Sequence, residues 1–176
     1  MTELVLDMTS AFRMMHTDKD NPLVLYLDKR SDFDLANTCY QYGKLKGKPI
    51  YKNWNPKKPT IQCDFKKTPF PDKKYKLVII DPPHRIENDK GDLSLKYGVL
   101  CPETWQAEIK GAFAEGWRVL DDYGTLVFKW CEHNKDIDEI LRLFPVKPVV
   151  VQKTAAAKKK NGRLGSTLWA IFLKVP

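Results

Sequence analysis

Short apolar runs that end in an aspartate recur along the first half of the chain. They occupy residues 4–6, 23–27, 60–63 and 75–80, and the residues that follow them are Asp7, Asp28, Asp64 and Asp81. Runs of this kind are typical of strands that are covered on both faces of a sheet. We expect the four acids to lie along one edge of that sheet, because alternation with helices makes neighbouring strands parallel.

A helical period dominates the second half of the chain. It spans residues 103–120, and its apolar stripe repeats every four residues at Trp105, Ile109, Phe113 and Trp117. Shorter patterns predict strands at 125–130, 149–151 and 168–173 and a helix at 135–143. The last two strands should pair as an antiparallel hairpin, because no helical pattern separates them. We therefore expect an α/β fold with a seven-stranded, mostly parallel sheet and an antiparallel last strand.

Length and composition narrow the class of protein. With 176 residues, of which 43% are hydrophobic, the chain fits one globular domain, residues 1–176, and no apolar run approaches the ~20 residues of a membrane span. The first residues lack the layout of a secretion signal. The four cysteines are far apart, which argues against a zinc ribbon or a disulfide framework. We expect a cytoplasmic protein without a metal site, whose cysteines mostly fill the core.

The charge of the chain is positive and clustered. The chain has 30 lysines and arginines and 22 acidic residues, which gives a net charge of +8 and an isoelectric point near 9.2. One lysine cluster with aromatic neighbours spans residues 44–67, and a second contains Lys158, Lys159 and Lys160. Basic residues beside aromatic ones can hold phosphates and stack bases, although lysine runs are also common on ordinary solvated surfaces. Nucleic acid is the partner that this pattern favours.

The segment Asp81-Pro82-Pro83-His84, which follows the most apolar strand, carries the clearest candidate chemistry. Each proline fixes φ and lacks a backbone N–H, so the Asp81 carboxylate and the Pro82 carbonyl form a rigid pair of acceptors. The exocyclic amine of adenine or cytosine has two N–H donors that would fill this pair, while His84 stacks on the ring. The alternative is an Asp-Pro turn that only ends a strand.

The same four residues resemble the Asp-Pro-Pro-aromatic motif of amino-methyltransferases that modify adenine or cytosine. The whole chain is also similar to short methyltransferase-like proteins of phages and mobile elements. The shared pattern includes Asp64-Phe65, Lys96-Tyr97-Gly98, Arg118-Val-Leu120 and Phe128-Lys129-Trp130. The resemblance implies a Rossmann-like class I methyltransferase fold, with S-adenosylmethionine as the methyl donor.

The resemblance also implies a donor site at the ends of three strands. The turn of Asp7, Thr9, Ser10, Ala11 and Phe12 would face the methionine part of the donor. Asp28 would accept hydrogen bonds from the ribose hydroxyls, since an acid at this place does so in dinucleotide folds. Asp64 and Phe65 would contact the adenine of the donor.

On the acceptor side, Asp81, Pro82, Pro83 and His84 would be the catalytic residues. Hydrogen bonds from the amine to Asp81 and Pro82 would favour a pyramidal nitrogen and free its lone pair for in-line attack on the sulfonium methyl. Other substrate contacts are expected at Tyr97 and Trp130 by stacking and at Lys96, Lys129, Lys158, Lys159 and Lys160 on phosphates. Trp130 could equally be a core residue. Little chain remains for target recognition, so sequence selectivity should be weak, or a partner subunit or a second copy would supply it.

The first loop departs from the family pattern. It carries no glycine, whereas glycine would let a ligand lie against bare backbone, so Ser10 and Ala11 could reshape the donor site. Ser10 and Arg13 could compensate by binding the donor carboxylate. Three functions are consistent with the sequence. The favoured one is an adenine methyltransferase of DNA, and a methyltransferase that acts on RNA, a small molecule or a protein amine is the second. The third is a nucleic-acid-binding or regulatory subunit with a degenerate donor site.

Overall fold

The computed structural model describes residues 3–30, 39, 44, 46–49, 57–86, 94, 97–154 and 165–176. The predicted phosphate contacts Lys96, Lys158, Lys159 and Lys160 lie outside these residues. Within them, no helix has both the length and the apolar character needed to cross a bilayer.

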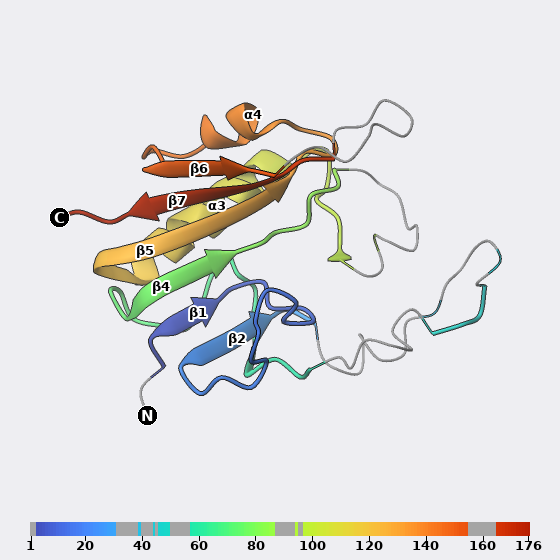
Figure 1. The fold of residues 1–176 in the computed structure, drawn as a ribbon, viewed down its shortest axis with the longest axis horizontal. Helices are drawn as coiled ribbons and strands as arrows, with labels where there is room; N and C mark the ends of the chain where they lie inside the picture. Colours follow the sequence, from blue (N-terminus) through green and yellow to red (C-terminus); the bar gives the residue numbers. More distant parts are fainter. Residues whose placement is uncertain are drawn as a thin grey trace.

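Seven strands form one sheet in the order β3-β2-β1-β4-β5-β7-β6 (Figure 1). The strands are β1 (Val5–Asp7), β2 (Val24–Asp28), β3 (Ile61–Gln62), β4 (Tyr75–Ile80), β5 (Leu120–Cys131), β6 (Val150–Lys153) and β7 (Thr167–Leu173). Strands β3, β2, β1, β4 and β5 pair in parallel, and β7 is antiparallel to both β5 and β6. The predicted α/β fold, its mostly parallel sheet and its C-terminal hairpin are confirmed.

Two elements have bounds that differ from the predicted ones, β5 at its start and α4 in its length. Strand β5 begins at Leu120, five residues before the predicted start, because Tyr75 already pairs with Leu120 before a register shift. Helix α4 (Ile137–Leu141) is shorter than predicted. It begins after Asp136, whose side chain accepts a hydrogen bond from the Glu139 N–H at 2.8 Å; such a cap fixes where a helix starts.

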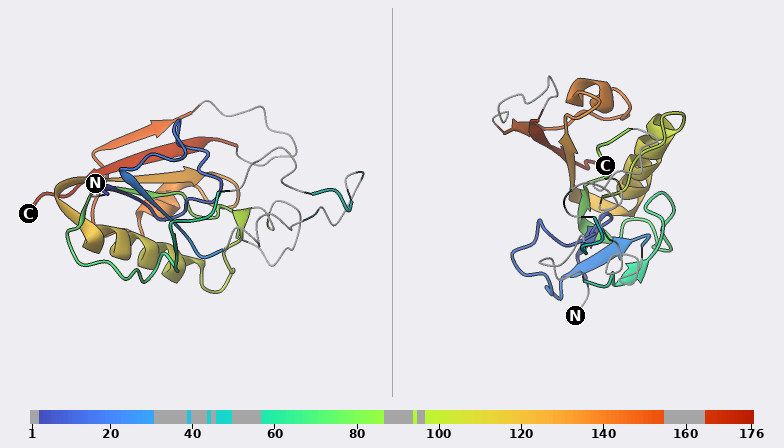
Figure 2. Two further views of the ribbon diagram at one scale, coloured as in Figure 1. Left: turned by 90° about the horizontal axis from the view of Figure 1, so that it is seen from below. Right: turned by 90° about the vertical axis from the view of Figure 1, so that its right-hand side faces the viewer.

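Helix α3 (Trp105–Val119) packs closely on one face of the sheet (Figure 2). A Cβ at Gly116 would lie 2.9 Å from Ile80 Cδ1 and 3.2 Å from Met8 Sδ, so only glycine permits this approach. Phe113 stacks on Phe144 after α4, with ring centroids 4.0 Å apart. The aromatic stripe of α3 is therefore core, as predicted, and holds both helices against the face that contains Ile80.

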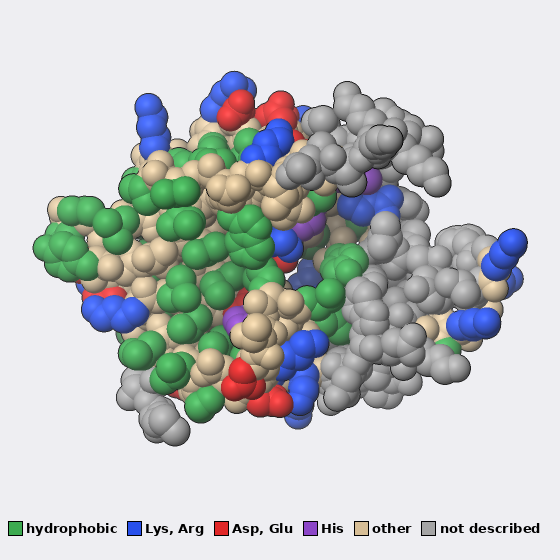
Figure 3. Space-filling view, in the orientation of Figure 1, with side chains coloured by type: hydrophobic (Ala, Val, Ile, Leu, Met, Phe, Trp, Pro, Cys, Tyr) green, Lys and Arg blue, Asp and Glu red, His purple; other side chains and the backbone are tan. Residues whose placement is uncertain are grey.

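The opposite face of the sheet is covered differently. Over β1 and β2 it is covered by residues 8–23, which contain no helix; there Arg13 lies 3.8 Å from the centroid of the Tyr26 ring. Over β4, β5 and β7 this face shows many hydrophobic side chains at the surface (Figure 3). Toward the edge, Val150 of β6 is 49% exposed. One end of this face leads into the cavity described below.

The cysteines do not behave as the composition suggested. Cys39 and Cys101 are exposed, and Cys63 and Cys131 are partly exposed. The prediction that they fill the core is wrong. Cys131 lies on the partly exposed face of β5, because its neighbour Trp130 takes the buried face.

Candidate active site

A cavity of about 700 Å³ opens at the carboxyl ends of β1, β2 and β4. The chain runs from β1 to β2 on one side and reaches β4 on the other side of β1, so this is the point where the strand order reverses. Ligands of open α/β sheets bind at such a point. The volume is in the range of pockets that enclose most of a cofactor-sized ligand.

The loop after β1 lines the cavity with the predicted residues Asp7, Thr9, Ser10, Ala11 and Phe12. It folds without glycine because two L-residues take up the left-handed conformation: Ala11 has φ 40° and Arg13 has φ 52°. Such a conformation costs an L-residue about 1–2 kcal/mol. Hydrogen bonds hold the loop in place, from Ser10 N–H to the Leu27 carbonyl at 2.9 Å and from Ala11 N–H to Asp28 Oδ2 at 3.0 Å.

Arg13 does not reach the donor side of the cavity. Its guanidinium donates to the Lys58 carbonyl at 2.6 Å, lies 3.3 Å from Asp20 Oδ1 and stacks on Tyr26. The suggestion that Arg13 binds a donor carboxylate is therefore wrong, since its side chain is committed to the opposite side of the loop.

Asp7 is buried and serves the loop itself. Its Oδ1 accepts from Thr9 N–H at 3.0 Å, and its Oδ2 lies 2.8 Å from His16 Nε2. Burial raises the pKa of the Asp7 carboxyl, even though the contacts with His16 and Thr9 act in the other direction. Asp7 lines the cavity, but most of its hydrogen-bonding capacity is used within the fold.

Asp28 lies at the predicted place at the end of β2 and lines the cavity. Its Oδ1 accepts from Arg30 N–H at 2.9 Å and from Arg30 Nε at 3.1 Å. Its Oδ2 accepts from Ala11 N–H and from a terminal nitrogen of Arg30 at 3.2 Å. A carboxylate has about four acceptor positions. Ribose hydroxyls would therefore have to take the place of Arg30.

Of the two residues predicted to bind the donor after β3, Phe65 lines the cavity and Asp64 does not. Phe65 is buried and lines the cavity. Asp64 is exposed and outside the lining; its Oδ1 accepts from Lys66 N–H at 2.9 Å, and its Oδ2 lies 3.3 Å from Lys66 Nζ. The predicted contact of Asp64 with the adenine of the donor is not supported, because the side chain closes a local turn instead.

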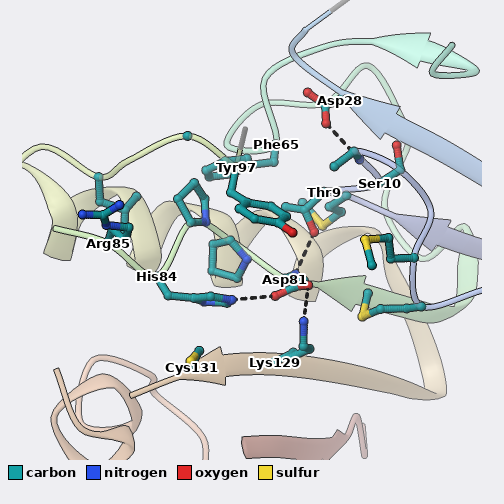
Figure 4. A pocket seen from close by; sticks show the side chains of 18 of the residues that line it. Thr9, Ser10, Asp28, Phe65, Asp81, His84, Arg85, Tyr97, Lys129 and Cys131 are labelled. Carbon is teal, nitrogen blue, oxygen red and sulfur yellow. Dashed lines mark hydrogen bonds and ion pairs between the residues drawn. The ribbon is translucent and has the colours of Figure 1, made fainter. Parts of the chain in front are cut away.

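Asp81 ends β4 at the rim of the cavity, and three contacts hold it (Figure 4). Its N–H donates to Thr9 Oγ1 at 2.7 Å, which joins the loop after β1 to the motif. Its carboxylate accepts from Lys129 Nζ at 2.6 Å and faces His84 Nε2 at 3.2 Å. Burial raises the pKa of Asp81, but His84 and Lys129 outweigh it, and the pKa lies below its ordinary value. Asp81 is thus an ionised acceptor inside the cavity.

The two prolines are held by the segment that carries Tyr97. Pro82, Pro83 and Tyr97 all line the cavity, and Tyr97 projects into it in Figure 4. Gly98 has φ +78°, and a Cβ there would lie 3.3 Å from Pro83 Cγ. The close approach of Gly98 to Pro83 therefore keeps Tyr97 beside the Asp-Pro-Pro-His segment.

Trp130 is not a substrate contact. It is fully buried, and its Nε1 donates to the Lys135 carbonyl at 2.9 Å. Successive side chains of a strand point to opposite faces, so Lys129 lines the cavity while Trp130 joins the core. The aromatic residue on the cavity side is Trp169 of β7, which pairs directly with Lys129. The prediction of stacking at Trp130 is wrong, and the alternative that Trp130 is a core residue is confirmed. The strand register that brings Trp169 beside Lys129 comes from the tertiary structure.

Further residues that line the cavity were not predicted as site residues. They include methionines of the loop after β1, cations after β2 and β4, and polar residues at the ends of β5 and β7: Met14, Met15, Lys29, Arg30, Arg85, Cys131, His133 and Thr167. Lys29 and Arg30 belong to the Leu-Asp-Lys-Arg part of the pattern shared with the phage proteins, and the signal for the others was that they follow or flank predicted strands.

The comparisons with known proteins bear on the fold. No protein-family model matches the sequence, and no curated protein matches it. A SAM-dependent methyltransferase from Methanosarcina mazei matches with a TM-score of 0.56 and 12% identity over 97% of this chain and 92% of that chain. The N-methyltransferase NodS from Bradyrhizobium japonicum WM9 gives 0.54 and 11% over 98% and 85%. The 1,6-didemethyltoxoflavin-N1-methyltransferase from Burkholderia thailandensis, solved with S-adenosylhomocysteine, gives 0.51 and 11% over 98% and 71%.

The chain has the Rossmann-like fold of S-adenosylmethionine-dependent methyltransferases. Matches at 10–12% identity establish this fold and leave the substrate open. The resemblance to phage and mobile-element proteins stays a prediction from the motifs.

Proposed function

We propose that this protein is an S-adenosylmethionine-dependent methyltransferase that acts on the exocyclic amine of a nucleic-acid base, with adenine in DNA as the favoured acceptor. The observation that carries the proposal is the position of Asp81. An ionised carboxylate followed by two prolines lies in the same cavity as the ends of β1 and β2, where this fold binds its donor.

The cavity has the volume and several of the side chains that S-adenosylmethionine would need. Asp28 would meet the ribose, and Phe65 would supply apolar surface for the adenine ring. Ser10 lines the turn that faces the methionine part. The one conflict is Arg30, which occupies acceptor positions of Asp28 and has to shift for the ribose to bind.

When bound, the donor supplies an electrophilic methyl group on a sulfonium. The chain supplies the rest, which is placement and charge. Asp81 accepts an N–H of the target amine and stabilises the positive charge that develops on the nitrogen. Pro82 and Pro83 fix the backbone beside it, so that little entropy is lost on binding. Thr9 holds the donor loop to Asp81 through one hydrogen bond, which sets the spacing of the two halves.

A nucleic-acid acceptor is supported by charge and by flat aromatic surface. The chain carries a net charge of +8, and Lys29, Arg30, Arg85 and Lys129 all line the cavity. Tyr97 and Trp169 present rings on the acceptor side, and base–aromatic stacking is a common way to hold an unpaired base. The preference for adenine in DNA comes from the resemblance of the Asp-Pro-Pro-His segment.

The test is incubation with isotopically labelled S-adenosylmethionine and single-stranded DNA, duplex DNA or RNA, followed by mass spectrometry of the nucleosides. We expect label in N6-methyladenine and none with Asp81→Ala. Label in another nucleoside would move the proposal to that base, and label in protein alone would overturn it.

A second candidate is a nucleic-acid-binding subunit without methyl transfer. The observation that favours it is the loop after β1, which has no glycine and is closed onto an Asp28 whose acceptor positions are filled. Calorimetric titration with S-adenosylmethionine separates the two. Binding supports the enzyme, and the absence of heat together with an unchanged melting temperature supports the subunit.

A further inference from the structure

The acceptor that the target amine requires is already occupied by an amine of the chain. Lys129 Nζ donates to Asp81 Oδ2 at 2.6 Å, and both side chains are about one-fifth exposed, at 22% and 20%. We propose that Lys129 is a specificity-determining residue. Because it binds Asp81, only an amine on a molecule that also has a phosphate can replace it there. This inference rests on the function proposed above.

The argument starts from what an incoming base has to replace. The contact between Lys129 and Asp81 is a charge-assisted hydrogen bond, which is stronger than the bond of a neutral aromatic amine. Asp81 Oδ1 is buried and has no hydrogen-bond partner among the described residues, so Oδ2 is the oxygen that the cavity offers to a ligand. A base that displaces Lys129 from Oδ2 breaks the stronger bond, forms the weaker one and leaves an ammonium without its counter-ion in a partly buried site. A phosphate on the same molecule removes this cost, because its oxygens accept the Lys129 ammonium.

The surroundings of Lys129 allow this exchange. The residue lies on the partly exposed face of β5, where its directly paired neighbour is Trp169, and Nζ is 5.7 Å from the centroid of that ring. Cys131 and Thr167, next along the same face, line the cavity. The lysine stem has four carbons and free rotation. Nζ can therefore leave Asp81 and stay within the cavity mouth, beside an aromatic face that attracts a cation.

His84 keeps Asp81 in place during the exchange. His84 Nε2 faces Oδ1 at 3.2 Å, while Lys129 binds Oδ2. The departure of Lys129 thus frees one oxygen and leaves the other contact in place. The alternative is a fixed ion pair, in which Lys129 only neutralises Asp81 and takes no part in choosing the acceptor.

The first measurement compares acceptors that carry the same base. Methyl transfer is measured with deoxyadenosine, its 5′-monophosphate and a short oligonucleotide with one adenine. We expect the wild type to prefer the phosphate-bearing acceptors, and Lys129→Ala to lower that preference in kcat/KM by about tenfold, through KM. Lys135→Ala is the matched control, since Lys135 Nζ lies 2.7 Å from Glu139 and 5.2 Å from the Trp105 ring, outside the cavity lining. An equal loss on all three acceptors would overturn the proposal.

The second measurement needs no turnover and separates this inference from the proposed function. Oligothymidylate has no exocyclic amine, so Lys129 should stay on Asp81 in the wild type. Asp81→Asn releases Lys129, which should bind one more phosphate and steepen the dependence of log K on log salt by about 0.7. The increase should disappear in Asp81→Asn combined with Lys129→Ala. If Asp81→Asn leaves the slope unchanged, or if the increase survives without Lys129, the proposal is wrong even where methyl transfer is observed.

Discussion

The two halves of the cavity hold their carboxylates in different ways. In the donor half, Asp7 and Asp28 bind backbone N–H groups of the neighbouring loop together with His16 or Arg30 from nearby in the chain. In the acceptor half, Asp81 binds Lys129, which comes from a strand 48 residues later. Asp7 and Asp28 thus help to fix the shape of a loop, while Asp81 is held by a lysine from a strand distant in the sequence.

The pKa values of Asp7 and Asp81 are shifted in opposite directions. Burial dominates at Asp7 and raises its pKa. At Asp81 burial also acts, but the contacts with His84 and Lys129 outweigh it and lower the pKa. Asp7 is therefore part of the fold, whereas the lowered pKa favours an ionised Asp81 at the rim of the cavity.

The largest effect is expected at Asp81. Asp81→Asn should reduce kcat by about 10²- to 10³-fold, because removal of one preorganised electrostatic partner of a transition state costs about this much. The variant should still fold, since the Asp81 N–H keeps its bond to Thr9 Oγ1. Asp122→Asn is the control, as Asp122 also binds a lysine at 2.6 Å, far from the cavity lining. Full activity of Asp81→Asn would show that the Asp81 carboxylate does not stabilise the transition state.

The second-largest effect is expected at Asp28, in the half of the cavity proposed to bind the donor. Asp28→Ala should weaken binding of S-adenosylmethionine by about 10- to 100-fold, as expected for lost hydrogen bonds to a charged group. It also removes the acceptor of the Ala11 N–H. Asp28→Asn keeps an oxygen for Ala11 and should lose less. Calorimetric titration of both variants measures this, and equal affinity in the wild type and Asp28→Ala would show that the donor does not use this residue.

The segment that joins the halves can be tested at Gly98. Gly98→Ala should lower methyl transfer by about tenfold, because the new Cβ would press on Pro83 as well as strain a φ of +78°. Gly47→Ala is a matched control, with the same φ and nothing within 4 Å of the added atom. The strain is common to both variants, so a loss of activity confined to Gly98→Ala isolates the contact with Pro83. Equal activities would contradict it.

The pH dependence of stability should distinguish Asp81 from an ordinary surface carboxylate. Since its folded pKa is lowered, Asp81 stabilises the fold above its unfolded pKa, and this contribution is lost as the pH falls through the lower folded value. The difference in unfolding free energy between the wild type and Asp81→Asn should therefore shrink as the pH falls from about 5 through the lowered folded pKa of Asp81. Urea titrations over this pH range measure it, and a constant difference would contradict the lowered pKa.

The smallest effect concerns the glycine-free loop. Ala11→Gly removes the cost of φ 40° but increases the entropy of the unfolded chain, so we expect a net stabilisation of about 0.5 kcal/mol. Ala114→Gly on the exposed side of α3 is the control and should destabilise by about 1 kcal/mol. If both variants destabilise equally in urea, the loop does not store strain at Ala11.

Several parts of the site were accessible from the sequence. The acids after β1, β2 and β4 stand at the cavity because a strand end is encoded locally, by an apolar run and the polar residue that follows it. The loop after β1 was identified as unusual from its lack of glycine, and the structure gives the reason as positive φ at Ala11 and Arg13. Asp64 failed as a prediction because the residues after a two-residue strand form a turn of their own.

The sequence by itself determined where the strands lie along the chain, the hairpin at the C-terminus and the position of the Asp-Pro-Pro-His segment, since each depends on neighbours within a few residues. Tertiary structure alone decided which charges meet. Lys129 reaches Asp81, Arg30 fills Asp28, and Trp169 takes the place predicted for Trp130, because strand register and side-chain alternation determine which distant residues share a face. A one-residue change of register would exchange those faces, and no local pattern specifies it.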